Sequence, residues 1–173
     1  MSVIIFDSED GNGKTQMARE LSRIMGIPYF KNRGEWRHFR EAPTAFREVT
    51  RWAIPFFLEY LEQTGASVIM DRGYPSEWVY SRYFDRPNDP DVLRELDDRF
   101  AALGAIIVVP YRTSYVVGDK YNAEITADVR GALRSLYAEF CEWTSCRTIR
   151  ICVDDEDLTR EMGEILNCTL ASA

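Results

Sequence analysis

Apolar residues follow two alternating patterns along this chain. Short unbroken apolar runs, typical of parallel strands that are buried on both faces, predict strands at 3–6, 27–30, 67–70, 105–109 and 148–153. Between them, apolar residues at helical spacing predict helices at 13–25, 45–63, 75–84, 91–103, 125–143 and 157–166. Pro55 is expected to kink the second of these helices. Strands that alternate with helices predict an α/β fold, with a parallel five-stranded sheet between two helical layers.

Length and composition narrow the class of protein. A chain of 173 residues with 46% apolar residues predicts one globular domain spanning 1–173. The net charge of -7 argues against a broad nucleic-acid surface but leaves room for a local basic groove. No apolar run is long enough to span a bilayer. Met1 leads directly into a core strand that a cleavable signal would remove, so we expect a cytoplasmic protein without a membrane partner.

Cysteine and histidine content restricts the metal chemistry. The four cysteines show no paired CxxC spacing and are expected to be reduced thiols, partly in the core, rather than zinc ligands. His38 is the only histidine, which argues against a histidine-rich metal centre or a Ser-His-Asp triad.

The first strand runs into the segment 7–16, DSEDGNGKTQ, which has the build of a phosphate-binding loop. Backbone N–H groups of the turn and the positive end of the following helix favour an anion. Lys14 adds a charge for the β- and γ-phosphates of ATP, and the Thr15 hydroxyl is a ligand for Mg²⁺. The expected donor-phosphate ligands are Ser8, Gly11, Asn12, Gly13, Lys14, Thr15 and Gln16. The alternative is a chance Gly-Lys-Thr at a helix start, but the strand, turn and helix all fall where the motif needs them.

One position departs from the usual loop spacing. Ser8 stands where the pattern has glycine. Glycine there permits a positive φ, in which serine would be strained. Because serine is small, the loop is still expected to close.

Polar residues follow several predicted strands at their carboxyl ends, where ligands bind in this class of fold. Asp7 follows the first strand, Asp71 and Arg72 follow the third, and Arg112 follows the fourth. We expect Asp71 to hold Mg²⁺ through water or to accept a proton, and Arg72 to clamp an acceptor oxygen or the transferred group. An ordinary structural ion pair is the alternative for these two residues.

Two blocks of residues resemble thymidylate kinases. The segment 6–16, FDSEDGNGKTQ, resembles the Phe-Glu-Gly-x-Asp-Gly-x-Gly-Lys-Thr/Ser loop of that family. The segment 71–76, DRGYPS, followed by Tyr80, resembles their Asp-Arg-Tyr-x-x-Ser segment and the Glu-Arg-Ser segment of deoxynucleoside kinases. The departures are Asp7 for glutamate, Ser8 for glycine, Asn12 where some members have arginine, and 31–37, KNRGEWR, where Arg-Glu-Pro-Gly is usual. The resemblance implies a three-layer α/β/α P-loop kinase fold.

The resemblance also implies roles for individual residues. Asp10 would help position the acceptor phosphate, and Asp71 and Arg72 would contact the acceptor side. Transition-state charge would be neutralised from a lid at about 111–123, with Arg112 and Lys120 as candidates. Thymidylate kinases are usually dimers, so a homodimer is possible.

The acceptor region is expected at about 31–64, because a nucleobase binds by stacking as well as by hydrogen bonds. Aromatic and arginine side chains are interleaved there and after the third strand. Phe56 and Tyr60 are expected to be core residues. The predicted substrate-binding residues are Asp7, Arg33, Trp36, Arg37, Tyr74 and Trp78.

The leading hypothesis is transfer of a phosphoryl group from ATP, with Mg²⁺, to a deoxynucleoside monophosphate. One alternative is a nucleoside kinase that uses the sugar 5′-hydroxyl, with Asp7 or Asp71 as general base. Another is a kinase of a modified nucleotide within DNA, which the acidic net charge disfavours. A non-enzymatic nucleotide-binding switch is the last alternative. A GTPase is disfavoured because the segment 109–112, VPYR, stands where Asn-Lys-x-Asp would fall.

Overall fold

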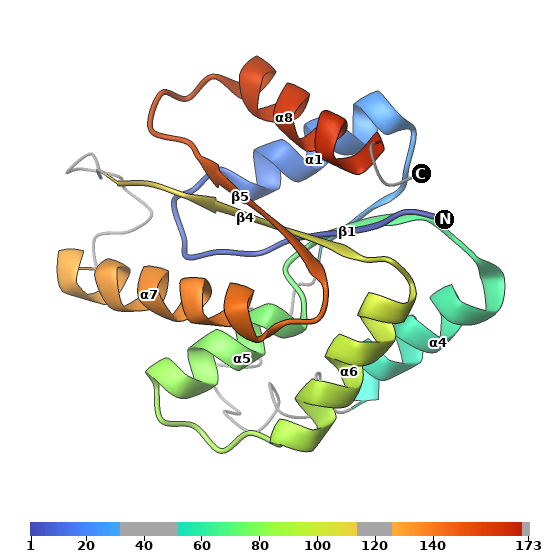
Figure 1. The fold of residues 1–173 in the computed structure, drawn as a ribbon, viewed down its shortest axis with the longest axis horizontal. Coiled ribbons are helices and arrows are strands. Elements are labelled where there is room, and N and C mark those ends of the chain that lie inside the picture. Colours follow the sequence, from blue (N-terminus) through green and yellow to red (C-terminus); the bar gives the residue numbers. More distant parts are fainter. Residues whose placement is uncertain (32–51, 114–125, 171–173) are drawn as a thin grey trace.

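A parallel five-stranded sheet forms the centre of the computed structural model, which describes residues 1–31, 52–113 and 126–170 (Figure 1). Its strands lie in the order β2-β3-β1-β4-β5. Their bounds are β1 Val3–Phe6, β2 Tyr29–Lys31, β3 Val68–Asp71, β4 Ile106–Tyr111 and β5 Arg147–Cys152. Strands β1, β3 and β4 are almost entirely buried, which accounts for their unbroken apolar sequences.

Register brings the candidate residues to one edge of the sheet. Phe6, just before Asp7, pairs with Asp71, and Asp71 also pairs with Lys31 at the end of the edge strand β2. On the other side of β1, Phe6 pairs with Val108 of β4. The carboxyl ends of β1, β2 and β3 therefore meet beside the start of the first helix.

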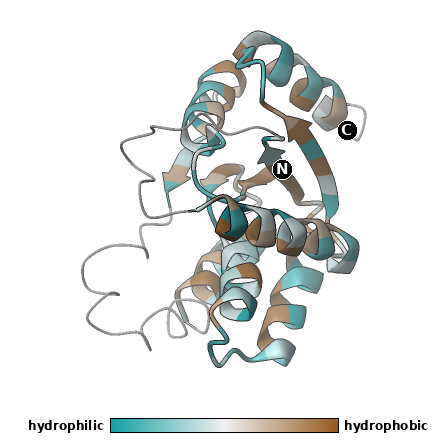
Figure 2. Ribbon diagram, turned by 90° about the vertical axis from the view of Figure 1, so that its left-hand side faces the viewer, coloured by the Kyte–Doolittle hydropathy of each residue, from teal (hydrophilic) through white to brown (hydrophobic). Residues whose placement is uncertain are grey.

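Helices cover both faces of the sheet (Figure 1). One face carries α1 and α8, and the other carries α4, α5, α6 and α7. The bounds are α1 Lys14–Met25, α4 Ile54–Thr64, α5 Tyr74–Tyr83, α6 Pro90–Ala102, α7 Ala127–Trp143 and α8 Leu158–Leu170. Figure 2 shows hydrophobic colour on the central strands, whereas the helices carry both hydrophilic and hydrophobic colour. No helix of the described residues is long and apolar enough to cross a membrane.

The predicted alternation of strands and helices is confirmed, with shifts of a few residues at the ends of elements. The largest difference is the helix expected at 45–63. In the structure α4 begins at Ile54 with Pro55 in its first turn, and residues 52–53 directly before it form a π-helical turn, so the helical path changes its hydrogen-bond spacing next to Pro55. The predicted part at 45–51 lies outside the described residues.

The assignment of Phe56 and Tyr60 to the core is wrong. Their side chains are 77% and 52% exposed, and Trp52, in the turn just before α4, is 66% exposed. The buried side of α4 is formed instead by Ile54, Leu58 and Leu61. The helical period of the aromatic residues was correct, but it marks the outer face.

Candidate active site

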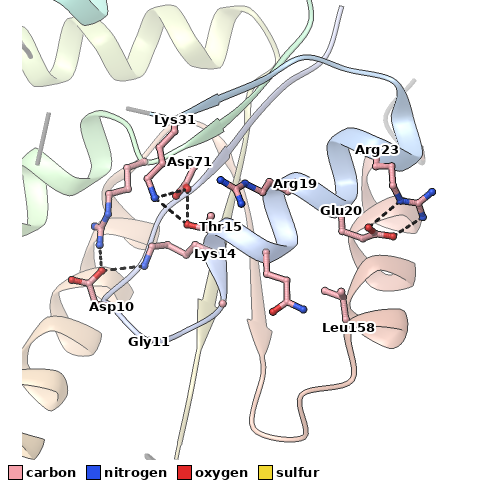
Figure 3. Close-up of a pocket in the computed structure, with 13 residues that line it drawn as sticks. Asp10, Gly11, Lys14, Thr15, Arg19, Glu20, Arg23, Lys31, Asp71 and Leu158 are labelled. Carbon is pink, nitrogen blue, oxygen red and sulfur yellow. Dashed lines mark hydrogen bonds and ion pairs between the residues drawn. The ribbon is translucent and has the colours of Figure 1, made fainter. Parts of the chain in front are cut away.

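A cavity of about 860 Å³ opens at the carboxyl edge of β1, β2 and β3, between the segment 7–13 and helix α1 (Figure 3). Cationic and anionic side chains surround it from elements far apart in the sequence. The lining residues are Asp10, Gly11, Gly13, Lys14, Thr15, Gln16, Arg19, Glu20, Arg23, Lys31, Asp71, Arg72 and Leu158.

The loop of residues 8–13 bends at its glycines. Gly11 and Gly13 have φ values of 93° and 72°, in the left-handed region that favours glycine, and Gly13 is the residue before α1. Ser8 does not adopt a positive φ, so the strain considered for this position is not present. Asn12 donates its Nδ2 to the carbonyl oxygen of Pro110 at 3.0 Å, which anchors the loop to β4.

Lys14 lies inside the loop. Its Nζ donates to the carbonyl oxygen of Glu9 at 2.7 Å and lies 3.7 Å from a carboxylate oxygen of Asp10. Burial, and then the charge of Arg72, lower the pKa of Lys14 to about 8, although nearby carboxylates act in the opposite direction. A bound phosphate would add negative charge next to this buried ammonium and so favour its protonated form.

Asp71 and Thr15 meet as a carboxylate–hydroxyl pair. Thr15 Oγ1 donates to Asp71 Oδ2 at 2.7 Å, and the Tyr29 hydroxyl donates to the same oxygen at 2.8 Å. Lys31 Nζ is 3.3 Å from this oxygen (Figure 3). Burial would raise the pKa of Asp71, but hydrogen bonds from Thr15 and Tyr29 and the Lys31 charge outweigh it and lower the pKa.

This donor set fits a Mg²⁺ ion that is held partly by phosphates and water. Among the described residues, no group of three or more His, Cys, Asp or Glu side chains could hold a metal. Mg²⁺ in phosphoryl-transfer sites commonly takes only one or two protein oxygens and obtains the rest from the nucleotide and water. Thr15 and Asp71 offer such a pair, and a cation from Lys31 already lies against both.

Arg72 and Asp10 form an ion pair on another side of the cavity. The guanidinium donates to Asp10 Oδ1 and to Ser76 Oγ, the latter at 3.1 Å. Burial would raise the pKa of Asp10, but the charges of Arg72 and Lys14 outweigh it and lower the pKa. Arg72 has a φ of 70°, an unusual conformation for a residue with a Cβ, which turns its side chain from the strand end toward the loop.

Arg112 contacts the loop from outside the cavity, since it is not among the residues that line it. Its Nε donates to the Gly11 carbonyl oxygen at 3.3 Å, and its Nη2 donates to Glu156 Oε1 at 2.8 Å. Thr113 N donates to Asp154 in the same region. The root of the predicted lid is therefore attached both to the loop and to the segment after β5. The predicted lid residues 114–123, with Lys120, lie outside the described residues.

Asp7 does not line the cavity. Its carboxylate is fully buried and accepts four hydrogen bonds, from the N–H groups of Gly73 and Ser76, the Ser76 hydroxyl and the Tyr137 hydroxyl. A carboxylate saturated in this way caps the start of α5. Its predicted roles in substrate binding, or as general base, are therefore corrected to a structural one.

Tyr74 and Trp78 are core residues, which corrects their predicted role in acceptor binding. Tyr74 is fully buried, and its hydroxyl donates to Asp97 at 2.6 Å. Trp78 is 4% exposed and packs against Phe140 and Trp143. Because α5 has no clear apolar face, its sequence does not indicate whether these two side chains point into the core or toward the cavity. The other predicted acceptor residues, Arg33, Trp36 and Arg37, lie outside the described residues.

Sequence reasoning missed five of the residues that line the cavity, Arg19, Glu20, Arg23, Lys31 and Leu158, and also Tyr29, which lies behind the lining. Arg19 lines the cavity and lies over the Tyr29 ring at 5.5 Å, while Tyr29 and Lys31 contact Asp71. The position of Lys31 could have been predicted, because the carboxyl ends of parallel strands share one edge of the sheet. The predicted strand, however, ends at residue 30. One added residue brings Lys31 opposite Asp71.

Comparison with solved structures shows similarity along nearly the whole chain. The YorR protein of Bacillus subtilis, crystallised with phosphorylated GDP, is 18% identical over 96% of this chain and 94% of its own, with a TM-score of 0.66. A deoxyadenosine kinase from M. mycoides, with dCMP and dCDP bound, is 17% identical over 100% of both chains, with a TM-score of 0.60. A thymidylate kinase from Ehrlichia chaffeensis is 17% identical over 96% of this chain and 98% of its own, with a TM-score of 0.55.

No protein-family model and no curated protein sequence matches the chain. At these identities the similarity concerns the fold. It confirms the predicted three-layer α/β/α P-loop kinase fold with a parallel five-stranded sheet, and the resemblance to nucleotide kinases at that level.

Proposed function

We propose that the chain is a P-loop kinase that transfers the γ-phosphoryl group of ATP, with Mg²⁺, to a deoxynucleoside monophosphate. The observation that carries this proposal is the single cavity lined by Lys14 and Thr15 from the loop and by the Asp10–Arg72 pair. Lys14 and Thr15 suit a triphosphate with its cation, whereas the Asp10–Arg72 pair suits an anionic acceptor that Arg72 can reach. The proposal treats 1–173 as one kinase domain, with an acceptor region at about 31–64 and a lid at about 111–123.

Each residue has a defined part in this reaction. The loop N–H groups and Lys14 bind the β- and γ-phosphates, for which Lys14 exchanges its bond to the Glu9 carbonyl oxygen. Thr15 and Asp71 would hold Mg²⁺, which would supply positive charge beside the phosphates. Arg72 leaves Asp10 to clamp an acceptor phosphate oxygen, and Arg112 approaches the transferred group from outside the cavity. Because phosphoryl transfer depends mainly on positioning and charge, these residues suffice without a covalent intermediate.

A nucleoside kinase on the same fold is the second candidate. The observation in its favour is Asp71, whose lowered pKa keeps a carboxylate at the cavity wall that could accept a hydroxyl proton. Asp7 is unavailable for this role because its oxygens are saturated. A DNA acceptor and a non-enzymatic switch are outcomes of the test below.

The test is a coupled assay of ADP release with ATP and Mg²⁺ across nucleosides, their monophosphates and one DNA duplex. We expect release that depends on a deoxynucleoside monophosphate. Lys14→Ala is the inactive control, with turnover lower by at least about 100-fold. Release only with nucleosides would favour the second candidate, and label transfer to DNA would favour a polymeric acceptor. Nucleotide binding without acceptor-dependent release would contradict the kinase proposal.

A further inference from the structure

Lys31 places an ammonium group against both oxygens assigned to the metal. Its Nζ lies 3.3 Å from Asp71 Oδ2 and 3.3 Å from Thr15 Oγ1, while those two oxygens are 2.7 Å apart. Figure 3 shows the three groups meeting at one point of the cavity wall, with Lys31 entering from the strand on the far side of Asp71.

The contact differs from an ordinary surface ion pair in its surroundings. The Asp71 side chain is 2% exposed, while that of Lys31 is 29% exposed and lines the cavity. A carboxylate with so little solvent needs a nearby positive charge, and the flexible lysine stem can supply one or withdraw it. The Tyr29 hydroxyl, 2.8 Å from the same oxygen, gives a hydrogen bond but no charge.

We propose that Lys31 is a tethered cation that occupies the divalent-metal position when no nucleotide is bound and competes with Mg²⁺ for Asp71 and Thr15. Metal entry requires the ammonium to move aside into the cavity, so Lys31 sets the metal affinity of the free protein. It is a positioning residue, because it acts on the metal through Asp71 and Thr15. The inference rests on the magnesium position in the proposed function.

A purely structural role for Lys31 makes the opposite prediction. If the ion pair only holds β2 against β3, its loss lowers stability and loosens Asp71, and metal binding weakens. If the ammonium competes with the metal, its loss frees Asp71 Oδ2, and metal binding tightens.

The experiment is a titration of the nucleotide-free protein with Mn²⁺ alone. Electron paramagnetic resonance measures the free Mn²⁺. We expect Lys31→Met to bind Mn²⁺ at least about tenfold more tightly than the unsubstituted chain, since one repelling charge is removed from the metal position. Mn²⁺ should also raise the melting temperature of this variant by more than that of the parent. Lys31→Gln provides the same comparison if the methionine variant does not fold.

Arg23→Met is the matched control. Arg23 lines the same cavity and carries the same charge, but it is exposed and paired with Glu20 at 2.7 Å. Its loss should change Mn²⁺ affinity by less than about threefold. If the Lys31 and Arg23 variants changed Mn²⁺ affinity equally, the effect would come from long-range charge alone, and the proposal would be overturned. Unchanged, weaker or unmeasurable binding by the Lys31 variants would overturn it as well.

Failure of this inference can be told from failure of the proposed function. Acceptor-dependent ADP release by the parent chain, without a shift in the Lys31 variants, would reject the tethered cation and keep the kinase. A shift without any ADP release would keep the metal competition and reject the kinase.

Discussion

Two aspartates at neighbouring strand ends have opposite environments. Asp7 follows β1 and Asp71 ends β3, the strand paired with β1, and both are almost fully buried. Asp7 receives two backbone N–H groups at the start of α5, besides two hydroxyls. Within the described residues, the donors to the Asp71 carboxylate are all side chains, those of Thr15, Tyr29 and Lys31, at the wall of the cavity.

The contrast shows that the nature of the donors, rather than burial alone, separates a structural carboxylate from one available for chemistry. Backbone donors cannot leave without unfolding the helix start, so Asp7 is committed to the fold. Hydroxyl and ammonium side chains at a cavity can rotate away, so Asp71 can exchange them for a metal or a proton.

The largest expected effect follows from replacing the exchangeable carboxylate. Asp71→Asn should lower turnover by about 1000-fold, because the metal loses its charged protein ligand. The free energy of unfolding should change by no more than about 1 kcal/mol, since the lost charge pair faces the cavity. Steady-state ADP release and urea unfolding measure the two quantities. Near-normal turnover would show that Asp71 is a structural residue like Asp7.

Asp7→Asn is the matched substitution, and its effect should be on stability. We expect a loss of about 1–3 kcal/mol in the free energy of unfolding, because a neutral amide is a weaker cap for two helix N–H groups. Turnover of the folded protein should fall by less than about tenfold, as an indirect effect through Arg72, whose Nη1 lies 3.7 Å from Asp7 Oδ1. Urea unfolding and assays at the same folded fraction test this. A large loss of turnover in a stable protein would return Asp7 to the active site.

The same distinction marks what the sequence could and could not predict. Strand ends and the glycine loop predicted that Lys14, Thr15, Asp71 and Arg72 lie close together, and they line one cavity, because position along a parallel strand determines which edge a residue reaches. Sequence could not show that Asp7 turns toward α5 and α7, since its partners are Gly73 and Ser76 and, 130 residues away, Tyr137.

Side-chain direction on helices was the other limit. Phe56 and Tyr60 were expected inside and lie outside, whereas Tyr74 and Trp78 were expected at the cavity and lie inside. Aromatic residues fit either environment, so only the packing of several helices on the sheet decides between them.

A smaller effect is expected from the titration of Lys14. Burial lowers its pKa to about 8, so the free protein loses this charge as the pH rises through 8. Bound phosphate favours the protonated amine, and ADP affinity should therefore be full below this pKa and fall above it, by at most about tenfold per pH unit. Calorimetric titration of ADP with Mg²⁺ across this range measures the slope.

Lys14→Arg is the control for that profile, because its guanidinium stays charged throughout the range. Its ADP affinity should show no inflection near pH 8. An identical inflection in both proteins would assign the titration to another group and leave Lys14 without a demonstrated phosphate contact.

The smallest expected effects come from two tyrosines that each donate one hydroxyl to one of the aspartates. Tyr137→Phe should lower the free energy of unfolding by about 1 kcal/mol, because it leaves Asp7 short of a donor in a site without solvent. Tyr29→Phe should cost less than about 0.5 kcal/mol, since the Thr15 hydroxyl and the Lys31 ammonium remain on the same oxygen of Asp71. The Tyr29 variant should instead bind Mn²⁺ about twofold more tightly, because one donor no longer occupies a lone pair of Asp71 Oδ2. Urea unfolding and Mn²⁺ titration of both variants give the four values. Equal destabilisation by the two substitutions would mean that Asp71 is fixed by its donors as firmly as Asp7, and the distinction between the two carboxylates would fail.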